Sequence, residues 1–181
     1  MKLGKKVLVE KDLNTVGGAC FLVNGIIFIF YAVLVPAYVH SVHGLITLAA
    51  VLYLFAIPSL YYALHRVHQV GSKGVALLFG VSMLILILSD LLLVSSSITA
   101  LSHAIAYVAG NLLFLIGVLI AGALMLKGVF YRWVAYLSII VGIVGLATYF
   151  PQAAGSTAWV SLLLLGVWSL AVGFNIRKLV K

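Results

Sequence analysis

Six long runs of apolar residues, separated by short breaks, take up most of this 181-residue chain. We place the runs at residues 15–36, 44–64, 75–94, 101–126, 133–150 and 158–174. A helix needs about 20 apolar residues to cross the hydrocarbon core of a bilayer. The runs are too long and too uniformly apolar to be strands of a membrane β-barrel. The sequence therefore predicts an all-α transmembrane bundle of six helices, forming a single integral membrane domain over residues 1–181.

The composition excludes the other classes of protein. Hydrophobic residues make up 65% of the chain and charged residues 8%, whereas soluble domains carry about 25% charged residues. A soluble fold of this composition would expose more apolar surface than water tolerates, and a disordered chain needs low hydrophobicity. The single cysteine, Cys20, cannot form an internal disulfide, so cysteine content does not indicate a compartment.

The basic residues all fall on one side of a six-span arrangement. They lie before the first run, between the second and third, between the fourth and fifth, and after the sixth: Lys2, Lys5, Lys6, Lys11, Arg66, Lys73, Lys127, Arg132, Arg177, Lys178 and Lys181. The loops at 37–43, 95–100 and 151–157 contain none. Connections rich in Lys and Arg stay in the cytoplasm. We therefore expect a cell-membrane protein with both termini cytoplasmic, whose net charge of +8 needs no nucleic-acid partner.

Small and turn-forming residues predict how the helices connect and pack. We expect turns at residues 70–74, 95–97 and 151–157. Three pairs of glycines recur at seven-residue spacing: Gly18 with Gly25, Gly110 with Gly117, and Gly166 with Gly173. Seven residues are nearly two helical turns, so each pair shares a face on which a neighbouring helix can approach closely. These faces indicate packing within the bundle, with a homo-oligomer or a larger membrane complex as the alternative.

Asp90 is the only acidic residue inside the apolar runs. A charge at membrane depth is costly, so such a residue is by default a candidate for function. Asp90 lies near the end of the third run, and His103 lies near the start of the fourth. In a tight antiparallel hairpin the two reach a similar depth in the outer leaflet. Helix rotation, which the sequence does not fix, decides whether they face each other.

Polar side chains at helical spacing form two stripes. They lie on the fourth and first runs: His103, Tyr107 and Asn111, and Asn24, Tyr31 and Tyr38. Together with Asp90, these stripes predict a polar pocket, open to the outside, that binds a small solute or moves protons. The alternative is a network of hydrogen bonds that only holds helices together.

The histidines leave a metal or haem site open. His40 and His43 lie three residues apart at the outer side, where His103 could complete a metal site. His43 and His103 are also the one pair of histidines on different helices that could ligate a haem. The inner pair, His65 and His68, is more simply explained by contact with lipid headgroups. We expect no cofactor, with haem or quinone as the alternative.

Motifs of catalysis are missing from the sequence. It has no phosphate-binding glycine loop, no H-E-x-x-H, no G-x-S-x-G and no paired intramembrane carboxylates. The sequence therefore predicts a protein that is not an enzyme. Handling of a small solute or of protons around Asp90 is the leading hypothesis. The alternatives are a structural accessory subunit of a larger complex and a redox subunit that binds haem or quinone.

Two features give the chain a resemblance to a known group. Gly17-Gly18 stands near the start of the first run, and an aromatic and basic segment, residues 129–133, precedes the Gly-rich fifth run. With its short loops, the chain resembles the small six-helix membrane proteins of bacteria and archaea that are grouped only as a domain of unknown function. The resemblance implies a fold and no activity, so it transfers no functional residues.

Overall fold

The computed structural model describes residues 2–34, 43–128, 130–149 and 158–179, and all the regular structure in these ranges is α-helical. The helices are α1 (Lys2–Leu34), α2 (His43–His65), α3 (Gln69–Val94), α4 (Ala100–Met125), α5 (Arg132–Ala147) and α6 (Ala158–Lys178). The prediction of an all-α fold with six helices is therefore confirmed.

Five of the six helices are long and apolar enough to cross a membrane: α1, α2, α3, α4 and α6. The apolar helix α5 has 16 residues. At 1.5 Å per residue it is about 24 Å long, against about 30 Å for the hydrocarbon core. The predicted fifth run continues to residue 150, which lies outside the described residues. The helices are compatible with an integral membrane protein, and five of them meet the length for a span.

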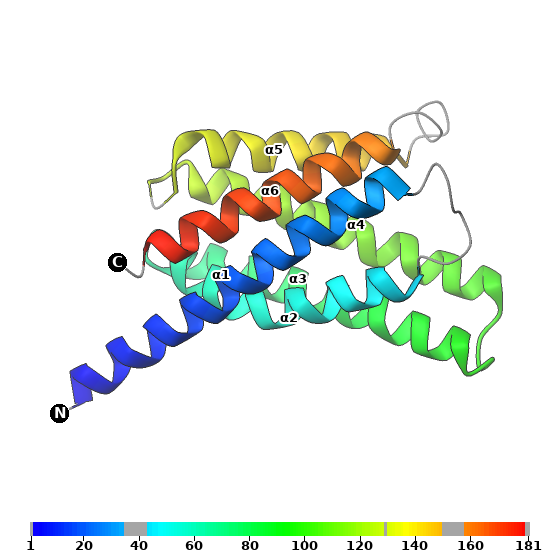
Figure 1. Ribbon diagram of the computed structural model, residues 1–181, viewed down its shortest axis with the longest axis horizontal. Helices are drawn as coiled ribbons and strands as arrows, with labels where there is room; N and C mark the ends of the chain where they lie inside the picture. Colours follow the sequence, from blue (N-terminus) through cyan, green and yellow to red (C-terminus); the bar gives the residue numbers. More distant parts are fainter. Residues whose placement is uncertain (1, 35–42, 129, 150–157, 180–181) are drawn as a thin grey trace.

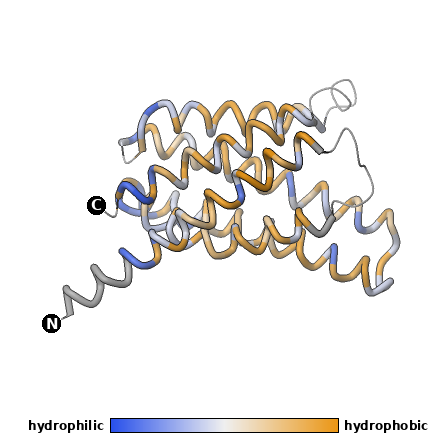
Figure 2. The backbone as a smooth tube through the Cα atoms, viewed as in Figure 1, coloured by the Kyte–Doolittle hydropathy of each residue, from blue (hydrophilic) through white to orange (hydrophobic). Residues whose placement is uncertain are grey.

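The helices form a closed ring in sequence order. Each helix packs against its neighbours in the chain, and α1 packs against α6 to close the ring. Smaller contacts of α2 with α4 and α6 cross the middle. Both termini lie at the same end of the bundle (Figure 1), and hydrophilic stretches gather at that end (Figure 2).

Glycines bring α1 and α6 together. A Cβ atom added to Gly25 would lie 2.8 Å from the carbonyl oxygen of Gly166, and one added to Gly166 would lie 2.9 Å from that of Gly25. A Cβ on Gly173 would likewise lie 2.8 Å from the oxygen of Gly18. The two backbones approach so closely that no side chain fits between them. The predicted use of these glycines for packing within the bundle is therefore confirmed.

The predicted turn at residues 70–74 is wrong, because α3 already begins at Gln69. His68 caps the helix, since its Nδ1 atom accepts a hydrogen bond from the backbone N–H of Gly71 at 2.9 Å. A Cβ atom on Gly71 would lie 2.9 Å from Leu124 of α4. This glycine therefore serves close packing inside a helix rather than a turn.

The predicted turn at residues 95–97 is confirmed. It follows the end of α3 at Val94, and Ser96 adopts a left-handed backbone conformation with φ of 57°. Thr99 then caps α4 by accepting a hydrogen bond from the backbone N–H of Ser102 at 3.2 Å. The third predicted break, residues 151–157, lies outside the described residues.

A cluster of aromatic rings fills the middle of the bundle. It takes one ring each from α1, α2, α3, α4 and α6, with contacting centroids 5.0–6.5 Å apart: Phe21, Tyr53, Phe79, Phe114 and Trp168. Hydrogen bonds extend the cluster, since Trp168 Nε1 donates to Ser138 Oγ of α5 at 2.6 Å. The Tyr53 hydroxyl lies 2.5 Å from Ser169 Oγ. All six helices therefore meet in this layer, which we call the aromatic layer.

Candidate functional site

Asp90 and His103 are buried and in direct contact. Asp90 lies one turn before the end of α3, His103 lies in the first turn of α4, and each is 7% exposed. His103 Nε2 is 2.7 Å from Asp90 Oδ1. The short serine turn places the two residues at matching depth, and the rotation of the helices directs them toward each other. An imidazole and a carboxyl at this distance can exchange a proton.

Thr47 of α2 holds the other oxygen of the same carboxyl. Its hydroxyl donates a hydrogen bond to Asp90 Oδ2, so Asp90 is bound from both neighbouring helices. Sequence reasoning missed Thr47. The signal in the sequence was membrane depth. Thr47 lies near the start of the second run and Asp90 near the end of the third, so the two residues lie at a similar depth.

The carboxyl also borders a groove on the outer face of the bundle. The groove has a volume of about 410 Å³, lies between α2 and α3, and is lined by Thr47, Leu48, Val51, Asp90, Leu91, Leu93 and Val94. Thr47 and Asp90 supply its only polar side chains. The carboxyl of Asp90 therefore forms part of the wall of an otherwise mainly apolar groove on the surface of the bundle.

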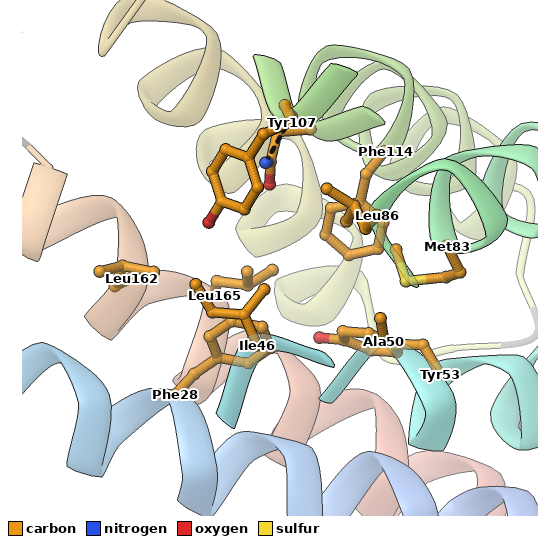
Figure 3. Close-up of a pocket in the computed structure, with 11 residues that line it drawn as sticks. Phe28, Ile46, Ala50, Tyr53, Met83, Leu86, Tyr107, Phe114, Leu162 and Leu165 are labelled. Atoms are coloured by element: carbon orange, nitrogen blue, oxygen red, sulfur yellow. Dashed lines mark hydrogen bonds between the residues drawn. The ribbon is translucent and has the colours of Figure 1, made fainter. Parts of the chain in front are cut away.

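On the inner side, Tyr107 and Asn111 line two adjoining cavities of about 50 and 180 Å³. The two spaces share these two residues as well as Phe114, Leu162 and Leu165, and together we call them the central cavity. Figure 3 shows the ring of Tyr107 extending from α4 toward Leu162 of α6. The rings of His103 and Tyr107 are 6.0 Å apart between centroids. Tyr107 therefore connects the Asp90–His103 pair with the central cavity.

The central cavity has polar and apolar walls but no charged side chain among its lining residues. Hydroxyl and amide groups come from four helices and from the residues just after α5: Tyr31, Tyr53, Tyr107, Asn111, Thr148, Tyr149 and Ser161. Tyr53 and Phe114 also belong to the aromatic layer, which closes the cavity toward the end that carries the termini. The cavity thus occupies the half of the bundle away from the termini.

Sequence reasoning missed Thr148, Tyr149 and Ser161 as lining residues. They lie near the end of the fifth run and the start of the sixth, at the same end of the bundle as Asp90. That common depth was the signal in the sequence, although these residues belong to neither of the two polar stripes on the first and fourth runs.

Asn24 lies apart from the other candidates. It is fully buried, and its Nδ2 atom donates to the backbone oxygen of Ala49 at 3.1 Å, which links α1 to α2. It is not among the residues that line the central cavity. On α4, Asn111 donates to the backbone oxygen of Tyr107 at 2.8 Å while facing the cavity. The other end of the Asn24 stripe, Tyr38, lies outside the described residues.

Most of the residues predicted to bind a metal ion or a haem are not described by the structure. His40 and the side chain of His43 lie outside the described part of the chain. His103 directs Nε2 to Asp90. Among the described residues, no group of three or more His, Cys, Asp or Glu side chains could hold a metal ion.

The inner histidines serve the turn between α2 and α3. His65 Nδ1 lies 3.2 Å from Ser72 Oγ, and His68 caps α3. Their arrangement stabilises the connection between two helices.

Comparison of the chain with protein-family models, curated proteins and solved structures found no match. What the protein does has to be inferred from the geometry of this site.

Proposed function

We propose that this chain is a non-enzymatic integral membrane protein that binds a small polar solute in the central cavity and couples its handling to a proton. In this proposal the protonatable unit is the Asp90–His103 pair. The observation that carries it is the 2.7 Å contact between these side chains, beside a tyrosine that lines the cavity.

A proton can pass between the two side chains without changing the net charge of the pair. A proton that moves from the carboxyl to the imidazole creates an ion pair with no net charge, and the reverse step restores two neutral groups. Uptake of a further proton gives the pair a net positive charge. Asp90 and His103 are the side chains of this site that can receive a proton from outside and release it again.

Tyr107 is the link between the pair and the solute. Its ring contacts that of His103 and forms part of the cavity wall. A solute that hydrogen-bonds in the cavity moves this ring, and so changes the surroundings of His103. Because no charged side chain lines the cavity, the solute that fits is small, uncharged and able to form hydrogen bonds.

We place the protein in the cell membrane with both termini in the cytoplasm and the central cavity opening outward. The support is that the basic residues gather at the end of the termini, following the rule that Lys-rich and Arg-rich connections stay inside. In a Cys20→Ala background, Ser96→Cys should react with a membrane-impermeant maleimide on intact cells. Lys178→Cys should react only after lysis, and the reverse pattern would contradict this orientation.

The function is tested by proton flux into liposomes. Purified protein is reconstituted, a potassium diffusion potential is applied with valinomycin, and an enclosed dye reports pH. Asp90→Asn should abolish proton flux. The variant should still elute from a sizing column as the wild type does and should still show a cooperative unfolding transition. Ser89→Ala is the matched control, because that buried neighbour bonds only to its own helix in the described contacts and should keep flux. Equal flux from the wild type and Asp90→Asn would refute the role of the carboxyl.

A further inference from the structure

A second pocket lies at the opposite end of the bundle from Asp90. It has a volume of about 270 Å³ and is formed by the connection between α4 and α5 together with the last turn of α6. Its lining residues are Gly128, Phe130, Tyr131, Asn175, Lys178 and Leu179, none of which lines the central cavity. We call it the terminal pocket.

Contacts between the walls fix the shape of this pocket. The Nζ atom of Lys178 lies 5.2 Å from the centre of the Tyr131 ring, in a cation–π contact. The buried Asn175 accepts a hydrogen bond from the backbone N–H of Tyr131 at 3.4 Å. Its Nδ2 atom donates to the oxygen of Ala171 at 2.9 Å. The cation and the aromatic ring are therefore held together at the pocket.

The charge around the terminal pocket is positive. Lys127, Arg132 and Arg177 are exposed next to it in the chain, and Lys178 forms part of its wall. The sequence contains no acidic residue after Asp90. Cations in the last turn of α6 interact favourably with the negative end of the helix dipole. This interaction explains why Arg177 and Lys178 stand at the helix end, but it does not explain a pocket beside them. An anionic group is the ligand that this charge favours.

Apolar and aromatic groups complete the walls. Phe130 is 5% exposed and Leu179 is half-buried, and both line the pocket. Tyr131 and Trp133 are exposed beside it, as is typical of aromatic residues at the level of lipid headgroups. An anion that matches this site has a charged part for Lys178 and an apolar part for Phe130 and Leu179.

We infer that the terminal pocket binds the phosphate-bearing headgroup of an anionic phospholipid. Lys178 contacts the phosphate, and Phe130 and Leu179 pack against the glycerol and the first acyl carbons. Basic pockets between helices near the cytoplasmic side of a membrane bind lipid headgroups in this way. The inference depends on membrane insertion but not on proton or solute handling, because the two sites share no residue.

The test is the thermal unfolding temperature of the protein in detergent micelles. It is measured with phosphatidylglycerol, phosphatidylcholine or glycerol phosphate added. Phosphatidylglycerol should raise the unfolding temperature of the wild type, and phosphatidylcholine should not. Lys178→Gln should need about fivefold more phosphatidylglycerol for the same rise. Lys178→Arg should behave as the wild type, because it keeps the charge. Lys73→Gln removes an exposed lysine near the start of α3 and should also leave the response unchanged.

Two results would overturn the inference. An unchanged response of Lys178→Gln would show that the effect of the anionic lipid arises elsewhere. An equal rise with glycerol phosphate alone would assign the pocket to a soluble phosphate compound instead of a lipid.

Discussion

Asp90 Oδ1 and His103 Nε2 lie 2.7 Å apart on two helices joined by residues 95–99. Asp90 is the one buried acidic side chain among those the structure describes, and Thr47 binds its second oxygen. If the carboxyl only held the helices together, an amide in its place should leave proton flux unchanged. If the carboxyl exchanges a proton with the imidazole, the amide should abolish that flux, and this difference makes the proposal testable.

Two substitutions at His103 separate the structural role from the proton role. His103→Leu should lower the free energy of unfolding by about 1–3 kcal/mol, because Asp90 loses a hydrogen-bond donor. His103→Gln should recover most of that stability, since its amide can donate to the carboxyl. Proton flux should be lost in both variants, because neither side chain takes up a proton. Wild-type flux in His103→Gln would contradict the proposal.

Thr47→Val should cost about 1 kcal/mol of unfolding free energy, because the substitution keeps the shape but removes the hydroxyl that binds Asp90. The measurement is unfolding in mixed micelles by denaturant. Thr15→Val is the control, since the hydroxyl of this exposed threonine donates to Lys11 of its own helix. If Thr47→Val and Thr15→Val had the same free energy of unfolding, the hydrogen bond between Thr47 and Asp90 would make no net contribution to stability.

Gly25→Ala should destabilise the protein by about 1–3 kcal/mol, because the added methyl group overpacks the contact between α1 and α6. The new atom would lie 2.5 Å from Leu170 and 2.8 Å from the oxygen of Gly166. Gly80→Ala is the control, as a Cβ there meets nothing within 4 Å. It should be neutral or raise stability by up to about 1 kcal/mol through helix propensity. Thermal unfolding of both variants checks this, and similar losses would refute the close-packing account.

His68→Ala should cost about 1 kcal/mol, because α3 loses the side chain that caps Gly71. His68→Asn should retain most of the stability, since asparagine is a favoured cap. Amide hydrogen exchange at Gly71 reports the cap directly and should speed up only in the alanine variant. Equal exchange in both variants would show that the cap contributes little.

The helices could be predicted from the sequence because the apolar runs are long and uninterrupted, and five of the resulting helices are long enough to cross a bilayer. The start of α3 could not, since Gly71 and Gly74 resemble turn residues when read locally. In the structure this stretch is helical, and Gly71 packs closely against Leu124 of α4, a contact between distant segments that a local reading does not show.

The candidate site could be predicted only in part, because contacts between distant segments also determine which side chains meet there. Asp90 and His103 stand at similar distances from a short serine turn, which gives their depth but not their orientation. Thr47, Thr148 and Ser161 reach the site from three other segments of the ring, and the pattern of a single apolar run does not show which segments pack together.

If Asp90 handles a proton, its carboxyl changes protonation state, and infrared difference spectroscopy detects that change without knowledge of the solute. Spectra of the protein in bilayers are recorded at two pH values and subtracted. The difference spectrum of the wild type should contain a carboxyl stretching band that is absent in Asp90→Asn. The band should remain in Asp12→Asn, which removes an exposed acid of α1. Identical difference spectra of the wild type and Asp90→Asn would contradict the claim.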